Sequence, residues 1–122
     1  KYRSSEKMLE IVDKSDVIIG SPACRGHVTG KARVVLKKED IASFVDGEIL
    51  VTIMTSIDYV HIMKKASAVV TDEGGITCHA AIFSREFGVP CIIGTRIATQ
   101  VLKTGNILEV DANTGKVTKL KN

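Results

Sequence analysis

Short runs of valine and isoleucine recur along the chain and predict the strands of a β-sheet. Each run is rich in β-branched side chains and is separated from the next by turn-forming or helical sequence. The last run is followed by Asn113-Thr114-Gly115 and a further short stretch, a pattern typical of two strands joined by a turn. The predicted strands preceding that turn are residues 33–36, 48–53, 68–71, 91–94 and 107–110.

Between these strands, apolar residues recur at helical spacing. Residues 57–66 carry them on one side, which predicts a helix with one buried face. Two residues compete as its N-terminal cap, since Thr55 with Asp58 resembles a capping box and Ser56 is an equally suitable cap. Further helices are predicted over residues 78–87, where Gly88 and Pro90 end the pattern, and over residues 97–103.

The order of these elements predicts a single compact α/β domain with a β-rich layer. The domain is assigned to residues 20–122, and residues 1–19 are assigned to an N-terminal helix or linker that leads into it. The helical spacing of apolar residues within 5–14 is the basis for that assignment. A chain of 122 residues with 44% hydrophobic and 25% charged residues suits one globular domain.

Composition argues against several classes of function. No apolar run approaches the roughly 20 residues of a membrane helix, so no membrane partner is expected. A net charge of +3 with 4% aromatic residues lacks the dense basic and stacking surface of nucleic-acid binding. Three cysteines without repeated spacing predict free thiols in a reducing cytoplasm, and the cysteines and histidines show no spacing of metal ligands.

The stretch from Thr71 to Ile82 carries the candidate chemistry. A strand runs into Gly74 and Gly75, which allow a partner to approach the backbone closely. Thr77 is a plausible N-cap, which would place Cys78 and His79 in the first turn of the next helix. The unpaired N–H groups and the positive dipole end of that turn attract anions and disfavour the imidazolium ring. The pattern therefore favours His79 as a neutral nucleophile that carries a phosphoryl group, although an isolated helical histidine is more often structural.

The segment from Thr71 to Gly94 (TDEGGITCHAAIFSREFGVPCIIG) resembles the signature of the phosphohistidine swivelling domain of phosphoenolpyruvate-utilising enzymes. Residues 20–35, 47–52, 63–71, 104–105 and 110–117 resemble other parts of the same family, so the resemblance covers about residues 20–118. It implies a swivelling β/β/α fold with His79 as the phosphoryl-accepting nucleophile. The same helix start favours phosphate-supporting roles for Gly74, Gly75, Thr77 and Cys78. The resemblance implies regulatory phosphorylation of Thr77, although a plain helix cap is the favoured interpretation of that residue.

Within that family the Thr-Cys-His triplet at 77–79 is most similar to phosphoenolpyruvate synthase. The resemblance implies a dikinase-type phosphotransferase in which the histidine accepts a phosphoryl group from an ATP-binding (ATP-grasp) domain. The group is then delivered to pyruvate on a phosphoenolpyruvate/pyruvate-binding domain. ATP and Mg²⁺ are expected on these companion domains, because residues 26–31 (GHVTGK) are one residue short of a phosphate loop and are followed by alanine.

Two alternatives stay open. One is a carrier domain of the rifampicin phosphotransferase type, which differs in the final acceptor. The other is a docking or regulatory module that keeps the fold without turnover. In every case this chain is not expected to complete a reaction alone.

Overall fold

The computed structural model describes residues 17–74 and 79–121, and within them the strands join in one eight-stranded sheet. The strand order is β1-β8-β7-β3-β4-β5-β6-β2. The strands are β1 Val17–Ile19, β2 Ser21–Cys24, β3 His27–Val35, β4 Ile49–Thr52, β5 Ala68–Thr71, β6 Cys91–Ile93, β7 Ile107–Asp111 and β8 Lys116–Lys121. The helices are α1 Lys38–Ile41, the 3₁₀ turn η2 Ile57–Tyr59, α2 Val60–Lys65, α3 His79–Phe87 and α4 Ala98–Val101.

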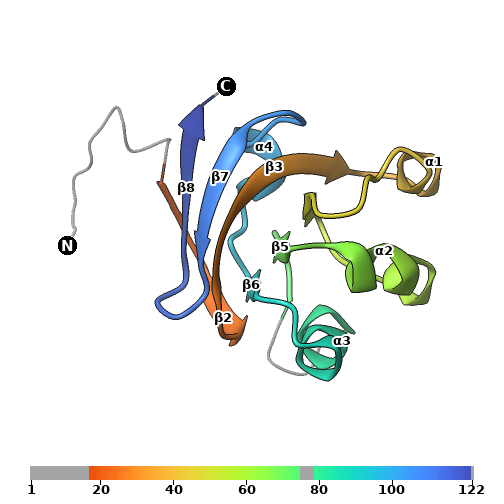
Figure 1. Cartoon of the computed structure of the whole chain (residues 1–122), viewed down its shortest axis with the longest axis horizontal. Helices are drawn as coiled ribbons and strands as arrows, with labels where there is room; N and C mark the ends of the chain where they lie inside the picture. Colours follow the sequence, from red (N-terminus) through yellow and green to blue (C-terminus); the bar gives the residue numbers. More distant parts are fainter. Residues whose placement is uncertain (1–16, 75–78, 122) are drawn as a thin grey trace.

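Strand β3 divides the sheet into two halves. It pairs antiparallel with β7 along its first five residues and parallel with β4 along its last four. Strands β4, β5 and β6 continue the parallel half, and β7 and β8 form the antiparallel half. Figure 1 shows α1, α2 and α3 on one side of the parallel strands, with β7 and β8 away from these helices. The carboxyl ends of the parallel strands therefore meet at one edge.

One segment covers both outer edges of the sheet. Strand β1 pairs with β8 at one end of the strand order, and β2 pairs with β6 at the other. Only Gly20 separates β1 from β2, and its N–H donates a hydrogen bond to the Gly115 carbonyl at 2.9 Å. A side chain at Gly20 would lie within 2.8 Å of Ile92, Ile93 and Thr95, so the crossing requires glycine. The sheet thus closes on itself, which protects its edges from further pairing.

The parallel strands are buried on both faces, and their alternating side chains enter two separate cores. On β4, Ile49 and Val51 pack with β7, β8 and α4, whereas Leu50 packs toward α2 and α3. On β5, Val70 and Val69 divide in the same way. All five of these β4 and β5 side chains are fully buried. Continuous apolar runs of this kind are typical of parallel strands covered on both sides, which explains why they were recognisable in the sequence.

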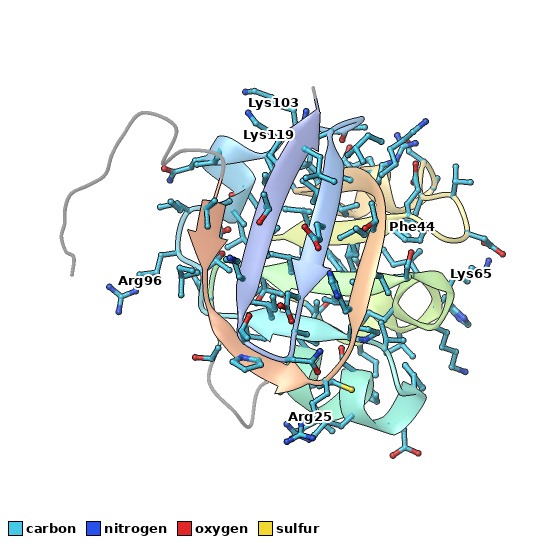
Figure 2. All side chains as sticks on the ribbon, turned by 60° about the vertical axis from the view of Figure 1, so that its left-hand side comes forward. Arg25, Phe44, Lys65, Arg96, Lys103 and Lys119 are labelled. Atoms are coloured by element: carbon cyan, nitrogen blue, oxygen red, sulfur yellow. The ribbon has the colours of Figure 1, made fainter. Side chains whose placement is uncertain are left out.

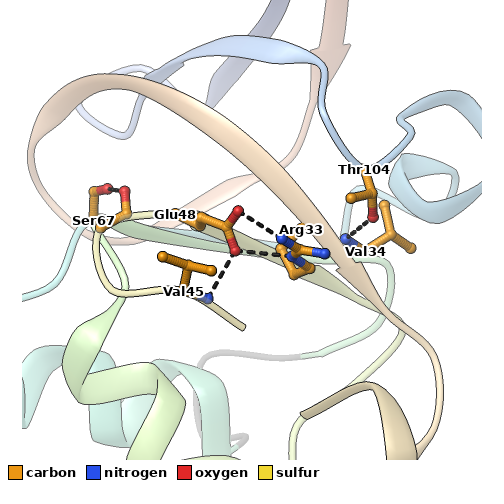
Figure 3. Close-up of polar contacts among 7 residues, drawn as sticks. Arg33, Val34, Val45, Glu48, Ser67 and Thr104 are labelled. Carbon is orange, nitrogen blue, oxygen red and sulfur yellow. Dashed lines mark hydrogen bonds and ion pairs between the residues drawn. The ribbon is translucent and has the colours of Figure 1, made fainter. Parts of the chain in front are cut away.

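A partly buried ion pair joins β3 to the residue that precedes β4. The Glu48 carboxylate accepts hydrogen bonds from Arg33 Nε at 2.8 Å, Arg33 Nη2 at 3.0 Å and the Val45 backbone N–H at 2.9 Å (Figure 3). Nearby, the Thr104 hydroxyl accepts a hydrogen bond from the Val34 N–H at 2.9 Å. These contacts fix the place where the chain leaves the antiparallel half and enters the parallel half.

The predicted elements agree with the structure best in the parallel half. Strand β5 has the predicted bounds, and α3 ends where predicted. The prediction of one α-helix over residues 57–66 is wrong for the first turn, because residues 57–59 form a 3₁₀ turn before α2. Ser56, not Thr55, is the N-cap residue, and neither side chain makes a capping hydrogen bond. The helix predicted over 97–103 is shorter, since only Ala98–Val101 is α-helical.

The N-terminal part of the domain differs more from the prediction. Strand β3 begins six residues before the predicted strand, because His27–Lys31 pair with β7 in a half-exposed segment that lacks a valine run. Residues 17–19, assigned to the leading segment, form β1, and Ile18 is buried in the core beside β8. The domain therefore includes these three residues. The helix predicted within 5–14 lies outside the described residues.

Candidate functional site

The site lies at the carboxyl edge of the parallel strands, where the loops after β4, β5 and β6 meet. The Asp72 and Glu73 N–H groups donate to the Thr52 and Ile53 carbonyls at 3.0 and 2.9 Å. The Thr95 N–H donates to the Thr71 carbonyl at 3.1 Å. These hydrogen bonds extend the strand pairing into the loops. In α/β sheets this edge is the usual location of a ligand site.

Asp72 connects this edge to α4. Its carboxylate accepts hydrogen bonds from the Thr99 N–H at 2.9 Å and the Thr99 hydroxyl at 2.5 Å. Its carbonyl accepts a hydrogen bond from the Arg96 N–H at 2.8 Å. Arg96 has a positive φ of 72°, a left-handed conformation that non-glycine residues adopt infrequently. The carboxylate of Asp72 is thus occupied by the N-terminal part of α4 and has a structural role.

His79 is the first residue of α3 and is exposed to solvent. The next two residues, Ala80 and Ala81, are buried against the sheet, so the start of the helix lies close to β5 and β6. The His79 ring stacks on Phe83 one turn later, with ring centroids 6.0 Å apart and an interplanar angle of 23°. Phe83 in turn stacks on Phe87 at 5.9 Å and 20°. This ladder of rings limits the orientations that the imidazole can take.

A pocket of about 320 Å³ lies beside His79. Three elements line it: the loop after β4, the end of β5 with its loop, and the first turn of α3. Thr71 and Glu73 contribute polar groups, but the Thr71 hydroxyl donates to the Glu73 carbonyl at 2.5 Å. The lining residues are Met54, Thr55, Thr71, Glu73, Gly74, His79, Ala80 and Ile82. The pocket is thus largely apolar, with a few polar groups next to the histidine.

The structure brings two of the predicted site residues together and does not describe three others. His79 and Gly74 line the same pocket, and Gly74 has a φ of 128°, which favours glycine. Gly75, Thr77 and Cys78 lie outside the described residues, so their predicted roles are untested. Thr55 also lines the pocket and was not among the predicted site residues, because its spacing to Asp58 resembles that of a capping box.

Charge and metal-ligating groups show no second site in the part of the chain that the structure describes. Figure 2 shows the labelled basic side chains Arg25, Lys65, Arg96, Lys103 and Lys119 pointing outward from different parts of the molecule. Within residues 17–74 and 79–121, no three His, Cys, Asp or Glu side chains are grouped to hold a metal ion. In the same residues, no helix has the length and apolar character needed to span a membrane.

The fold and this site define a class of protein: a small α/β domain that presents an exposed histidine at a helix start, beside a pocket. Comparison with protein families agrees with that description, since residues 44–115 match the model of the PEP-utilising enzyme, mobile domain. The chain belongs to this family. The family assignment and the α/β fold predicted from the sequence are therefore confirmed.

Several curated relatives carry the name phosphoenolpyruvate synthase. A probable phosphoenolpyruvate synthase from Archaeoglobus fulgidus is 45% identical over 117 residues, covering 96% of this chain and 16% of that protein. Phosphoenolpyruvate synthase from Pyrococcus furiosus is 45% identical over 120 residues, covering 98% of this chain and 15% of that protein. The chain thus spans about one sixth of the length of these relatives, which is the size of one domain.

Solved structures agree with the fold. The N-terminal domain of Enzyme 1 – Nitrogen has a TM-score of 0.55 and 26% identity, covering 66% of this chain and 34% of that one. Thermococcus kodakaraensis aconitase X has a TM-score of 0.63 and 21% identity, covering 86% of this chain and 98% of that one. The second likeness concerns the fold alone. The first is consistent with the swivelling β/β/α fold expected from the sequence.

Proposed function

We propose that this chain is a phosphohistidine carrier domain of a phosphoenolpyruvate synthase-like enzyme. His79 accepts a phosphoryl group from an ATP-binding domain and delivers it to pyruvate on another domain. The observation that carries the proposal is the position of His79, which is exposed at the start of α3 and lines the pocket at the carboxyl edge. Membership of the family and 45% identity to phosphoenolpyruvate synthase from Pyrococcus furiosus support it.

The chemistry requires one nucleophilic ring nitrogen. Its lone pair attacks the phosphorus of the donor, a P–N bond forms, and the P–O bond to the leaving nucleotide breaks. In the second step pyruvate loses a methyl proton to a base on its own binding domain, and the resulting enolate oxygen attacks the same phosphorus. The P–N bond breaks, and the ring nitrogen recovers its lone pair. The helix start at His79 stabilises the added negative charge by about 0.3–1 kcal/mol. ATP and Mg²⁺ would be held by the companion domains.

Apolar side chains around the pocket support contact with companion domains. Met54 and Ile82 line the pocket and are 59% and 46% exposed, and Ile57 at the start of η2 is 67% exposed. Large exposed apolar side chains near a reactive group suit a surface that a partner covers. Closure of a partner over this rim would exclude water, which otherwise competes for the phosphoryl group.

The test is phosphoryl transfer from labelled ATP in the full-length enzyme. We expect label on the chain that is acid-labile and base-stable, lost in His79→Ala and retained in His27→Ala. His27 is a matched control because it is an exposed histidine that contacts Glu109 at 2.6 Å, on strand β3. Label on the wild-type chain that persists in His79→Ala would contradict the proposal, and absence of label would favour a non-catalytic module.

The acceptor is tested separately. Chase of the labelled enzyme with pyruvate should yield labelled phosphoenolpyruvate, whereas transfer only to rifampicin would identify the alternative type of carrier. Among the relatives, the uncharacterized phosphotransferase YvkC of Bacillus subtilis is 40% identical over 101 residues. If His79 carries the phosphoryl group to another acceptor, phosphorylation of His79 stays as proposed and only the transfer to pyruvate is replaced.

A further inference from the structure

Thr55 has a buried hydroxyl without a hydrogen-bond partner among the described residues. The residue is 6% exposed, and its Oγ1 atom is inaccessible to solvent. Buried hydroxyls in proteins are nearly always hydrogen-bonded, so each exception calls for an explanation. Capping of the following turn does not supply one, because Ser56 is the N-cap residue of η2. Within the described residues, nothing that packs against Thr55 therefore satisfies this hydroxyl.

The location of Thr55 indicates which group could satisfy its hydroxyl. Thr55 and His79 line the same pocket, although they come from different elements. The neighbouring threonine hydroxyls are occupied: Thr71 donates to the Glu73 carbonyl, and Thr95 donates to the Thr71 carbonyl at 2.9 Å. Of the two described threonines that line the pocket, only Thr55 thus has a hydroxyl without a partner.

The charge of the pocket favours a guest that is covalently attached. No lysine or arginine occurs among the described residues that line it, and an acidic residue, Glu73, is one of them. The start of α3 stabilises a negative charge by only about 0.3–1 kcal/mol, which is too little to hold a free anion in such a pocket. A phosphoryl group on His79 is held there by its P–N bond and brings three strong acceptor oxygens, which need donors.

We infer that the Thr55 hydroxyl donates a hydrogen bond to a phosphoryl oxygen carried by His79. Thr55 is then a second residue that contacts the transferred group, supplied by the loop after β4, whereas His79 comes from α3. This inference rests on the proposed phosphoryl-carrying role of His79. It assigns to the unpaired buried hydroxyl a partner that is present only in the phosphorylated state.

The experiment phosphorylates the full chain chemically, without ATP or companion domains. Phosphoramidate transfers its phosphoryl group to a histidine nitrogen: its P–N bond breaks, ammonia leaves, and a new P–N bond forms on the ring. The rate of labelling at His79 and the ³¹P resonance of the product are measured for wild type, Thr55→Val and Thr55→Ser. Ser84→Ala is the matched control, because Ser84 Oγ is also buried and unpaired but does not line the pocket.

We expect Thr55→Val to slow labelling about tenfold, the effect of losing one hydrogen bond to a charged acceptor. Its ³¹P resonance should move away from that of wild type. Thr55→Ser keeps the donor and should resemble wild type, as should Ser84→Ala. An unchanged rate and resonance in Thr55→Val would overturn the inference while leaving His79 as the carrier. An equal loss in Ser84→Ala would also overturn it, because the effect would then be structural.

Two further readouts keep the test decisive. If Thr55→Val does not fold, as judged by circular dichroism, the wild-type chain alone is used, and the Thr55 methyl resonance must shift on phosphorylation. Absence of that shift overturns the inference. If the wild-type chain carries no label at His79, the inference and the proposed function both fail. Addition of inorganic phosphate to the unmodified chain should leave the Thr55 methyl resonance unchanged. A shift equal to that of the phosphorylated chain would show that covalent attachment is not needed, and would overturn that part of the inference.

Discussion

Replacement of Glu48 is predicted to destabilise the domain more than replacement of any exposed acidic residue. The Glu48 side chain is 9% exposed and accepts three hydrogen bonds, two from Arg33 and one from the Val45 N–H. Glu48→Ala removes all three and leaves a guanidinium that is only 24% exposed. The matched control is Asp46→Ala, because Asp46 is 78% exposed and lies 3.9 Å from Lys65.

The magnitude follows from these exposures. A hydrogen bond to a charged group contributes about 1.5–3 kcal/mol, and a buried partner left unpaired adds its desolvation penalty. Arg33 reaches water over about a quarter of its side chain, so water replaces part of what is lost. We therefore expect Glu48→Ala to lower the free energy of unfolding by about 2–4 kcal/mol at pH 7. Asp46→Ala should lower it by less than about 0.5 kcal/mol.

The pH dependence of this effect has a defined sign. Burial opposes ionisation of Glu48, but the hydrogen bonds from Arg33 and Val45 and the charge of Arg33 outweigh it, so the pKa of Glu48 lies below its ordinary value of 4.5. A carboxyl whose pKa is lowered in the folded state stabilises the fold above its unfolded pKa. That contribution is lost as the pH falls through the folded pKa. The difference between wild type and Glu48→Ala should thus be constant from pH 7 to about pH 5 and shrink below it.

The assay is urea unfolding of the full chain at several pH values, followed by circular dichroism. Equal slopes of the transition in wild type and variant are needed, because a changed slope would indicate a change in the unfolded or folded state. Two results would refute the reasoning: a loss in Glu48→Ala no larger than in Asp46→Ala, or a loss that does not decrease between pH 5 and pH 3. Arg33→Ala should give a similar loss, and the double variant should lose less than the sum.

Two further predictions concern backbone shape and the ring ladder. Gly115→Ala should destabilise the chain by at least about 1–2 kcal/mol more than Gly105→Ala in urea unfolding. Both glycines have positive φ, 89° for Gly115 and 100° for Gly105. A Cβ at Gly115 would overlap a neighbouring carbonyl, whereas a Cβ at Gly105 would have no atom within 4 Å. Equal losses of stability in the two variants would contradict this steric argument. Phe83→Leu should slow labelling of His79 by phosphoramidate about two- to tenfold, because the stacked ring no longer orients the imidazole, while Phe87→Leu should have less effect.

The fold could be predicted where local sequence and tertiary structure impose the same pattern. Residues 68–71 form a buried parallel strand that reads as a continuous apolar run, and Gly88 ends α3 as its position predicts. The first half of β3 could not be found in this way. Its residues alternate between exposed and half-exposed positions, and its pairing with β7 comes from a strand about 80 residues later. Strands β1 and β2 are short edge strands, and their partners, such as Thr118 for Val17 and Ile93 for Ser21, are also far away in the sequence.

The site shows the same division between local and distant information. Gly74 and His79 lie in one sequence segment, so their association with a helix start was predictable from spacing alone. Thr55 reaches the pocket because β4 and β5 pair in parallel, with Thr52 opposite Thr71. The loops that follow two parallel strands in register leave the sheet side by side. That proximity depends on register, which the sequence did not specify.

The proposed carrier role places a constraint on how the phosphoryl group travels. A carrier serves two sites either by swinging its own helix or by moving as a whole domain. Helix α3 packs against β2, β5 and β6 through buried residues that include Ala80, Ala81 and Ser84. The Val89 N–H after the helix donates to the Ser84 carbonyl at 2.9 Å. Detaching α3 would expose this core at each transfer, so in the proposed function the entire domain moves and His79 keeps its place on it.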